Sequence, residues 1–218
     1  GGPDATADAG VEAALEAAAP EAAPRNLSFV SDTSWTSYAG TLTTGSPASY
    51  TVTQNLGPAR EVCLNASAPS HCPSGALDYG YVGSGTLVWA GGNTIPDASW
   101  IWRADVNTTS YAPMTVAIFK RDFLIPAQAT GSIQIAVDDL AAVFVNDMFI
   151  GSTGSLTDVA VAANAQNTLA TFDLSPALRV GTNTVTIATE KGPFGCNAGS
   201  CPYSLVGAGV VFKGSIHW

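Results

Sequence analysis

The feature that most constrains the fold is a series of short runs of β-branched and aromatic residues, separated by clusters of Gly, Pro, Asn and Ser. From Leu27 onward these runs are LSFV, SYTVTQ, TLVWA, SWIW, TVAIFKRDFLI, SIQIAV, AAVFVNDMFIG, TDVAV, LATFDL, NTVTIAT and GVVFKGSIHW. They show the two-residue alternation of half-buried strands, and no long helical pattern follows residue 25. Many short strands with frequent turn signals predict an all-β fold, a β-sandwich or jelly roll.

Residues 133–151 show the pattern most clearly and raise the main question about function. Apolar residues alternate up to Val137, two aspartates interrupt the run at Asp138 and Asp139, and alternation then resumes through Phe144 and Met148. Successive side chains of a strand point to opposite faces. The pattern predicts two strands joined at a corner that carries two adjacent carboxyl groups.

Composition excludes several classes of partner. The chain has 218 residues, of which 46% are hydrophobic and 11% charged, with a formal net charge of −9. A chain this acidic is a poor ligand for nucleic acid or for an anionic membrane surface. No apolar run approaches the roughly 18 residues of a transmembrane helix.

Residues 1–25 differ from the rest of the chain and are predicted to form an acidic, Ala- and Pro-rich extension. Their charged residues are five acids and a single base, Arg25, and a weak helical stripe would end at Pro20. Composition favours a disordered spacer, and docking against a domain is the alternative. The β-sandwich domain is then expected over residues 26–218, with a loop-rich excursion at about 55–98.

The four cysteines form two close pairs in sequence, Cys63 with Cys72 and Cys196 with Cys201. Local disulfides are the simplest pairing, because neither pair has C-x-x-C spacing and two histidines are too few to complete a zinc site. Disulfides indicate an oxidising compartment. Together with the lack of an initiator Met and of a signal peptide, they predict an exported protein, extracellular or on the cell surface.

Three segments of the C-terminal half follow one another in a familiar order. These are FKRDFLIP (119–126), IQIAVDDLAAVFVNDMFIG (133–151) and FDLSPALRVGTNTVTIATE (172–190). Over roughly residues 99–213 the chain resembles galactose-binding-like β-sandwich domains of secreted bacterial proteins, which are often attached to glycoside hydrolases. The resemblance implies an aspartate pair at one strand end, a tight turn at Asn146 and Asp147 in place of the usual Asn-Gly, and an L-x-x-G-x-N turn at residues 178–183. It implies the fold more than the function, because members bind glycans or only pack against neighbours.

Asp138 and Asp139 are the main candidates for a site. The segment VDDLAAVFVND is similar to the Asp-Asp motif by which PA14-like and flocculin lectins hold calcium against a sugar, with Asn146 or Asp147 as further oxygen ligands. The alternative is a strand corner at which one aspartate hydrogen-bonds the turn and the other faces solvent. Glycoside hydrolysis needs two carboxyl groups that face each other across a substrate, which neighbours in a strand cannot provide alone.

Tyr79 and Tyr81 are candidates for a sugar-binding platform, because they lie in the glycine-rich stretch LDYGYVG. The alternative is that these rings belong to the core. No nucleophile elbow, phosphate loop or recognisable catalytic histidine is present, and we therefore expect the chain not to be an enzyme.

Two non-enzymatic functions remain. The first is a structural subunit that polymerises into an extracellular fibre or surface layer, with the N-terminal extension docked into the next copy, for which residues 26–31 are the most strand-like segment. The second is a monomeric module that binds cell-surface glycans, with or without Ca²⁺. The sequence favours the first. Deletion of residues 1–25 separates them, because only the first function requires that segment.

Overall fold

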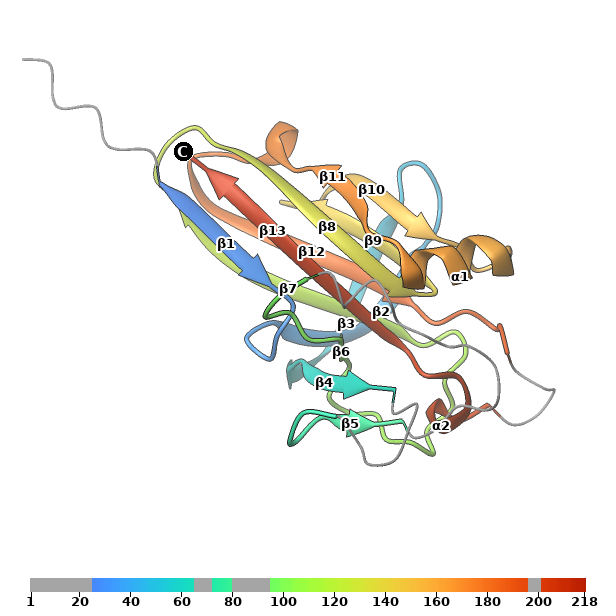
Figure 1. Ribbon diagram of the computed structural model, residues 1–218. Coiled ribbons are helices and arrows are strands. Elements are labelled where there is room, and N and C mark those ends of the chain that lie inside the picture. Colours follow the sequence, from blue (N-terminus) through green and yellow to red (C-terminus); the bar gives the residue numbers. More distant parts are fainter. Residues whose placement is uncertain (1–24, 65–71, 80–94, 196–200) are drawn as a thin grey trace, which may run out of the picture.

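The computed structural model describes residues 25–64, 72–79, 95–195 and 201–218, and these form two β-sheets packed face to face (Figure 1). The prediction of an all-β sandwich is confirmed. The predicted N-terminal extension and the run TLVWA lie outside the described residues, apart from Arg25. Among the described residues, no helix is long and apolar enough to cross a membrane.

The first sheet is built around the C-terminal strand, which has neighbours on both sides. Its strand order is β11-β8-β13-β6-β4-β5, and β1 also pairs with β13. The strands are β1 (Asn26–Val30), β4 (Arg60–Cys63), β5 (Leu77–Asp78), β6 (Ile101–Trp102), β8 (Thr130–Asp138), β11 (Ala170–Asp173) and β13 (Gly209–His217). Because β1 is hydrogen-bonded to residues 213–217, the strand-like segment near the N-terminus is already paired within its own chain.

The second sheet has the order β10-β9-β12-β7-β2-β3. Its strands are β2 (Thr36–Thr43), β3 (Ser49–Pro58), β7 (Val116–Ile125), β9 (Leu140–Val145), β10 (Met148–Gly154) and β12 (Gly181–Glu190). At its centre, β7 and β12 form an antiparallel ladder along their whole length, from Gly181 paired with Ile125 to Glu190 paired with Val116. This ladder fixes where the chain that follows β12 leaves the sheet.

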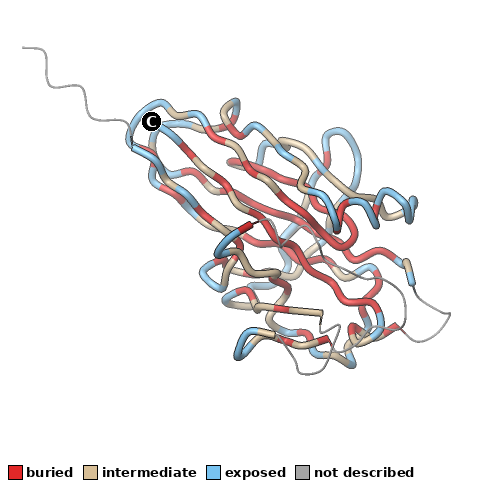
Figure 2. Tube along the Cα trace, in the orientation of Figure 1, coloured by how far each residue is buried: buried red, intermediate tan, exposed pale blue. Residues whose placement is uncertain are grey.

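The core lies between the two sheets and is lined by alternate residues of their strands (Figure 2). Aromatic rings pack at one end of it, where the ring of Trp35 lies 4.8 Å from that of Phe212 and 6.1 Å from that of Phe123. Burying one such side chain stabilises the fold by about 1.5–3 kcal/mol, so this cluster contributes strongly to stability.

A hairpin explains why β9 departs from strict alternation. All six residues of β9, LAAVFV, are buried. The far end of the β2–β3 hairpin covers the outer face of the second sheet. Tyr50 of β3 packs against Phe144 of β9, with 4.8 Å between the ring centroids. In the sheet order, three strands lie between β3 and β9. Both faces of β9 are therefore covered. A strand covered on both faces has a continuous apolar sequence in place of an alternating one.

One predicted strand is wrong. The run TDVAV at residues 157–161 leads into a helix, α1 (Val159–Asn167), whose N-cap is Asp158. The Asp158 carboxylate accepts hydrogen bonds from the backbone N–H groups of Ala160 and Val161, and alanines continue the helix. Capping chemistry thus outweighs the β preference of the two valines. A 3₁₀ turn, η2 (Ser175–Ala177), and a short helix, α2 (Tyr203–Val206), are the other helical segments described.

The disulfide prediction is confirmed for Cys63 and Cys72, which are bonded to each other. This bridge ties the end of β4 to the chain before β5, within the excursion predicted at 55–98. Cys201 is also disulfide-bonded, and its predicted partner Cys196 lies outside the described residues.

Candidate functional site

The aspartate pair stands at the corner between β8, which ends at Asp138, and β9, which begins at Leu140. The prediction of a strand corner is therefore confirmed. The expectation that one aspartate faces solvent is wrong, because both are buried: Asp138 is 0% exposed and Asp139 is 1% exposed. A cis peptide bond joins the two residues.

Lys191 lies between the two carboxylates. Its ammonium nitrogen Nζ is 2.6 Å from Oδ1 of Asp138 and 2.8 Å from Oδ2 of Asp139. The same Oδ2 of Asp139 accepts a hydrogen bond of 2.9 Å from the backbone N–H of Gly192. Lys191 follows β12 directly and is held by its backbone, since its N–H donates to the Thr115 carbonyl at 3.0 Å. The β7–β12 ladder thus positions the cation opposite the β8–β9 corner.

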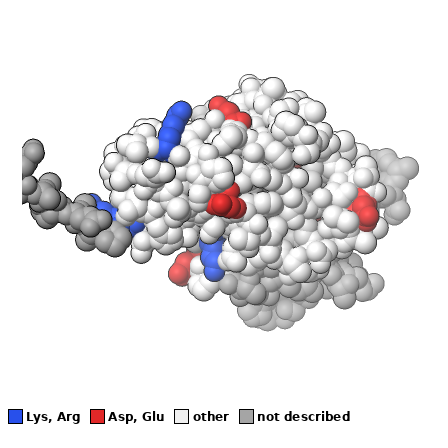
Figure 3. Space-filling model, turned by 90° about the horizontal axis from the view of Figure 1, so that it is seen from above, with Lys and Arg blue, Asp and Glu red and all other residues white. Residues whose placement is uncertain are grey.

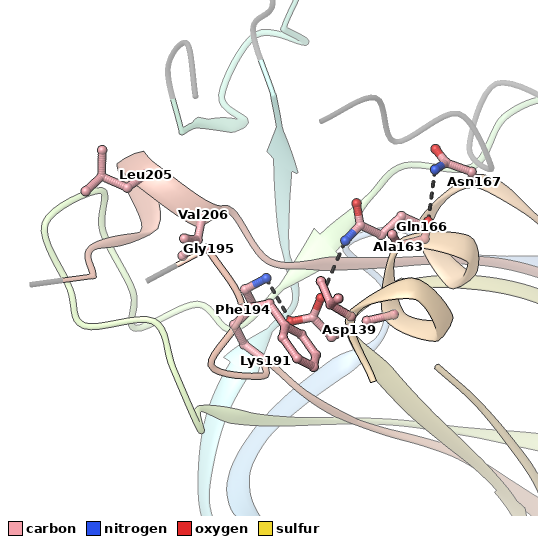
Figure 4. Close-up of a pocket in the computed structure, with 11 residues that line it drawn as sticks. Asp139, Ala163, Gln166, Asn167, Lys191, Phe194, Gly195, Leu205 and Val206 are labelled. Carbon is pink, nitrogen blue, oxygen red and sulfur yellow. Dashed lines mark hydrogen bonds and ion pairs between the residues drawn. The ribbon is translucent and has the colours of Figure 1, made fainter. Parts of the chain in front are cut away.

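Gln166 closes the site from the last turn of α1. Its side-chain nitrogen Nε2 donates to Oδ1 of Asp138 at 3.2 Å and reaches Oδ1 of Asp139 at 3.4 Å. The oxygen of the same amide points away from the carboxylates (Figure 4). Two carboxylates, one ammonium and one amide therefore form a single buried network.

Burial sets the electrostatics of this network. Burial raises the pKa of Asp138 to about 7; Lys191 opposes this rise and the neighbouring Asp139 adds to it. For Lys191, burial alone would lower the pKa, but the two carboxylates outweigh it and the pKa is raised. The lysine therefore stays protonated at neutral pH, whereas Asp138 exchanges its proton near neutrality.

A pocket of about 350 Å³ opens beside the network (Figure 4). It is lined by Asp139, Val159, Ala162, Ala163, Gln166, Asn167, Lys191, Phe194, Gly195, Leu205 and Val206. The polar groups come from the corner, from α1 and from the end of β12, whereas Phe194, Leu205 and Val206 form an apolar wall. Val159 is 61% and Leu205 53% exposed. The site therefore combines buried charge with an apolar opening. The face of the molecule in Figure 3 carries only a few scattered charged side chains and no charged patch.

Asn146 and Asp147 lie at the other end of β9, about 20 Å along the strand from the aspartate pair. Their φ angles of 53° and 64° confirm the predicted tight turn. The Asn146 side chain is fully used there, with hydrogen bonds to the Ala177 carbonyl, Asn183 Oδ1 and the Thr184 N–H. Asp147 accepts a hydrogen bond from the Tyr50 hydroxyl. The structure thus gives both residues a structural role in the turn and does not bring them to the pocket.

The expectation of an exposed sugar platform at Tyr79 is wrong. Tyr79 is 1% exposed, and its ring stacks on that of Tyr203 at 5.5 Å between centroids. A ring enclosed in this way offers no face to a sugar from solution, and the core alternative applies to it. Tyr81 lies outside the described residues.

Among the described residues, two groups have the donor types of a metal site. At Asp138 and Asp139, the Lys191 ammonium lies between the carboxylates, and a calcium ion there would have to displace it; calcium binding stays a prediction. Cys63, Cys72 and Asp78 also lie together, with ligand atoms within 4.8 Å of one another. Their two sulfur atoms are joined in the disulfide, so they provide no thiolates for a metal.

Sequence reasoning missed both partners of the aspartate pair. Lys191 is at an odd-numbered position directly after β12. The odd-numbered residues Val185 and Ile187 of that strand point into the core. That register was a usable signal that the lysine points inward. No comparable signal existed for Gln166, because its helix was predicted as a strand and a loop.

No family model matches the sequence, and no curated protein matches it. Among solved structures, an α-L-rhamnosidase of Streptomyces avermitilis complexed with L-rhamnose is 21% identical over 52% of this chain and 10% of its own, with a TM-score of 0.38. A β-glucuronidase of Ruminococcus gnavus is 14% identical over 57% of this chain and 24% of its own, with a TM-score of 0.34. An α-L-rhamnosidase of Aspergillus terreus is 13% identical over 50% and 13%, also with a TM-score of 0.34. This chain thus spans a quarter or less of these enzymes, and matches this remote carry no information on its activity or ligand.

Proposed function

We propose that the chain is a non-enzymatic glycan-binding module, an exported β-sandwich of the galactose-binding-like kind. The observation that carries the proposal is the pocket of about 350 Å³, in which a buried carboxylate–ammonium pair meets an apolar wall. Ligand pockets of small molecules start at roughly 300 Å³ and combine apolar walls with a few fixed polar groups. The volume and the lining both fit a single sugar residue.

The polar groups of the pocket match the chemistry of sugar hydroxyls, which donate and accept hydrogen bonds at once. Asp139 and the Gln166 oxygen are acceptors. An ammonium group has three hydrogens, and two of those on Lys191 are used by its ion pairs to the two aspartates. The third has no partner among the described residues, and Lys191 lines the pocket. Phe194 supplies an aromatic surface for the apolar face of a sugar ring.

The same geometry favours binding over hydrolysis. A glycosidase places an acid and a nucleophile or base on opposite sides of the scissile bond, about 5 to 10 Å apart. Here the two neighbouring carboxylates are held by one ammonium, and of the two only Asp139 is among the residues that line the pocket. Fixed, ion-paired carboxylates orient a ligand but leave its glycosidic bond without an acid on one side and a base on the other.

Export is part of the proposal and is supported by the Cys63–Cys72 disulfide, since such bonds persist in oxidising compartments.

Fibre formation stays the alternative prediction. Residues 1–24, on which it depends, lie outside the described residues, and strand donation by residues 26–31 would require β1 to leave β13.

A glycan array tests the proposal with the full chain and two matched variants. Ala163 is exposed and lines the pocket, so Ala163→Trp should fill it. Asn164 is exposed on the same helix outside the pocket lining, so Asn164→Trp adds the same ring elsewhere. We expect binding to at least one glycan by the wild type and Asn164→Trp, and its loss in Ala163→Trp. Equal signals from all three proteins would contradict the proposed site, and an array without any bound glycan would contradict the function. Repeating the array with EDTA tests the calcium prediction.

A further inference from the structure

The buried network contains more negative than positive groups. Two carboxylates, Asp138 and Asp139, share the single ammonium of Lys191, and all three side chains are at most 3% exposed. Charge buried without a full counter-charge is costly, and proteins reduce this cost by taking up a proton or a counter-ion. The raised pKa of Asp138 is one expression of that cost.

Two residues of α1 that line the pocket, Gln166 and Asn167, have amide oxygens that accept no hydrogen bond among the described residues. The Gln166 nitrogen is committed to the aspartates at 3.2 and 3.4 Å, and the Asn167 nitrogen Nδ2 donates to the Ala163 carbonyl at 2.9 Å. Flipping either amide would place its oxygen against another oxygen, which fixes both orientations. The two residues therefore line the pocket with acceptors whose donor halves are already used.

Asp139 adds a third acceptor. Its Oδ2 is held by Lys191 and Gly192, and its Oδ1 has a long contact of 3.4 Å to Gln166; its carboxyl group also hydrogen-bonds that of Asp138. A charged donor from a ligand would form a shorter and stronger bond there than the neutral amide does. The pocket thus offers three oxygens, and a primary ammonium group brings three hydrogens.

We propose that the pocket selects sugars that carry a free, protonated amino group over neutral and acidic sugars. This inference rests on the proposed glycan-binding function and specifies its ligand class. The ligand ammonium would contact Asp139 and the amide oxygens of α1, and would supply the positive charge that the network lacks. An acidic sugar would instead add a further negative charge beside Asp139.

The test compares two pairs of sugars that differ only at position 2, D-glucosamine with D-glucose and D-galactosamine with D-galactose. Dissociation constants are measured at pH 7 for the full chain by isothermal titration calorimetry. We expect the amine to bind at least about tenfold more tightly than its neutral counterpart in one pair or both, as for a charge-assisted hydrogen bond.

Two isosteric variants isolate the charge. Asp138→Asn removes a negative charge behind the pocket without changing a lining residue, and should reduce the preference for the amine several-fold. Asp173→Asn removes the same charge from β11, at the far end of β8, where Asp173 pairs with Ser132, and should leave the preference unchanged. Circular dichroism confirms that each variant is folded.

Equal affinities within both pairs, or an unchanged preference in a folded Asp138→Asn variant, would overturn the inference but leave the proposed function standing. If none of the four sugars binds while the array shows a neutral glycan bound in the pocket, the inference also fails. The proposed function itself is decided by the array with Ala163→Trp.

Discussion

Replacing Lys191 with Met should destabilise the protein strongly. The effect of the lost charge can be separated from the effect of lost packing. Methionine keeps most of the side-chain volume but removes the ammonium that lies 2.6 and 2.8 Å from two buried carboxylate oxygens. Removal of one partner from a buried ion pair typically costs about 3–5 kcal/mol, because the other partner is left as an uncompensated charge. We expect a loss of that size in the free energy of unfolding at pH 8.

The loss should shrink as the pH falls. Without the ammonium, the pKa of Asp138 should rise further, since Lys191 is the group that opposes the effect of burial. The folded variant then takes up a proton more readily than the wild type, and at pH 5 much of the unpaired charge is neutralised. The loss should therefore be smaller at pH 5 than at pH 8.

Urea unfolding followed by tryptophan fluorescence measures both values. Lys213→Met is the control, because Lys213 is half-buried on β13 and forms no ion pair among the described residues. It should cost less than about 1 kcal/mol. If Lys191→Met is too unstable to purify, the triple variant Asp138→Asn, Asp139→Asn, Lys191→Met should recover most of the stability, since none of the three charges of the network remains. A loss in Lys191→Met that equals the control at both pH values would refute the account of this network.

Three further results should follow from the structure. The free energy of unfolding of the wild type, relative to that of Asp138→Asn, should fall as the pH rises from about 4 to above 7. The reason is that the pKa of the Asp138 carboxyl is higher in the folded state (about 7) than in the unfolded chain (about 3.9). A difference that does not change with pH in urea titrations would contradict this. Asn146→Ala should cost about 3 kcal/mol in the same assay, with Asn146→Gly losing less, because both lose three hydrogen bonds but glycine adopts the positive φ freely. Replacing Cys63 and Cys72 together with serine should lower stability by about 2–3 kcal/mol, as expected for a bridge that spans a sequence separation of 9 residues.

The strand pattern was predictable wherever one face of a strand is buried. The alternation in β7, β8, β12 and β13 follows directly from the two-residue period, and the Asn146-Asp147 turn follows from residues that tolerate positive φ. The strand β2 was missed because its TSYAGTLT sequence is weakly apolar. Its place is set by tertiary contacts, as it joins β7 through residues 36–38 and then helps to cover the outer face of the second sheet.

The candidate site was only half predictable. The sequence places Asp138 and Asp139 at a corner, but local pattern has no information on a cation 53 residues away in the chain. Lys191 meets the aspartates only because β9 and β12 are paired, with Leu140 opposite Glu190. The prediction of a sugar platform at Tyr79 was wrong because it, too, depends on a contact distant in the sequence. A glycine-rich neighbourhood predicts exposure, whereas packing on Tyr203 buries the ring.

The central claim, that a glycan binds in the pocket beside Asp139 and Lys191, is tested most directly by chemical-shift mapping. A ¹⁵N-labelled full chain is titrated with the strongest glycan from the array, and amide shifts are compared across the molecule. The account predicts the largest shifts in α1, in residues 191–195 and in residues 205–206, with little change at the Asn146 turn. Shifts centred on another surface, such as the groove lined by β1, β8 and β13, would contradict it.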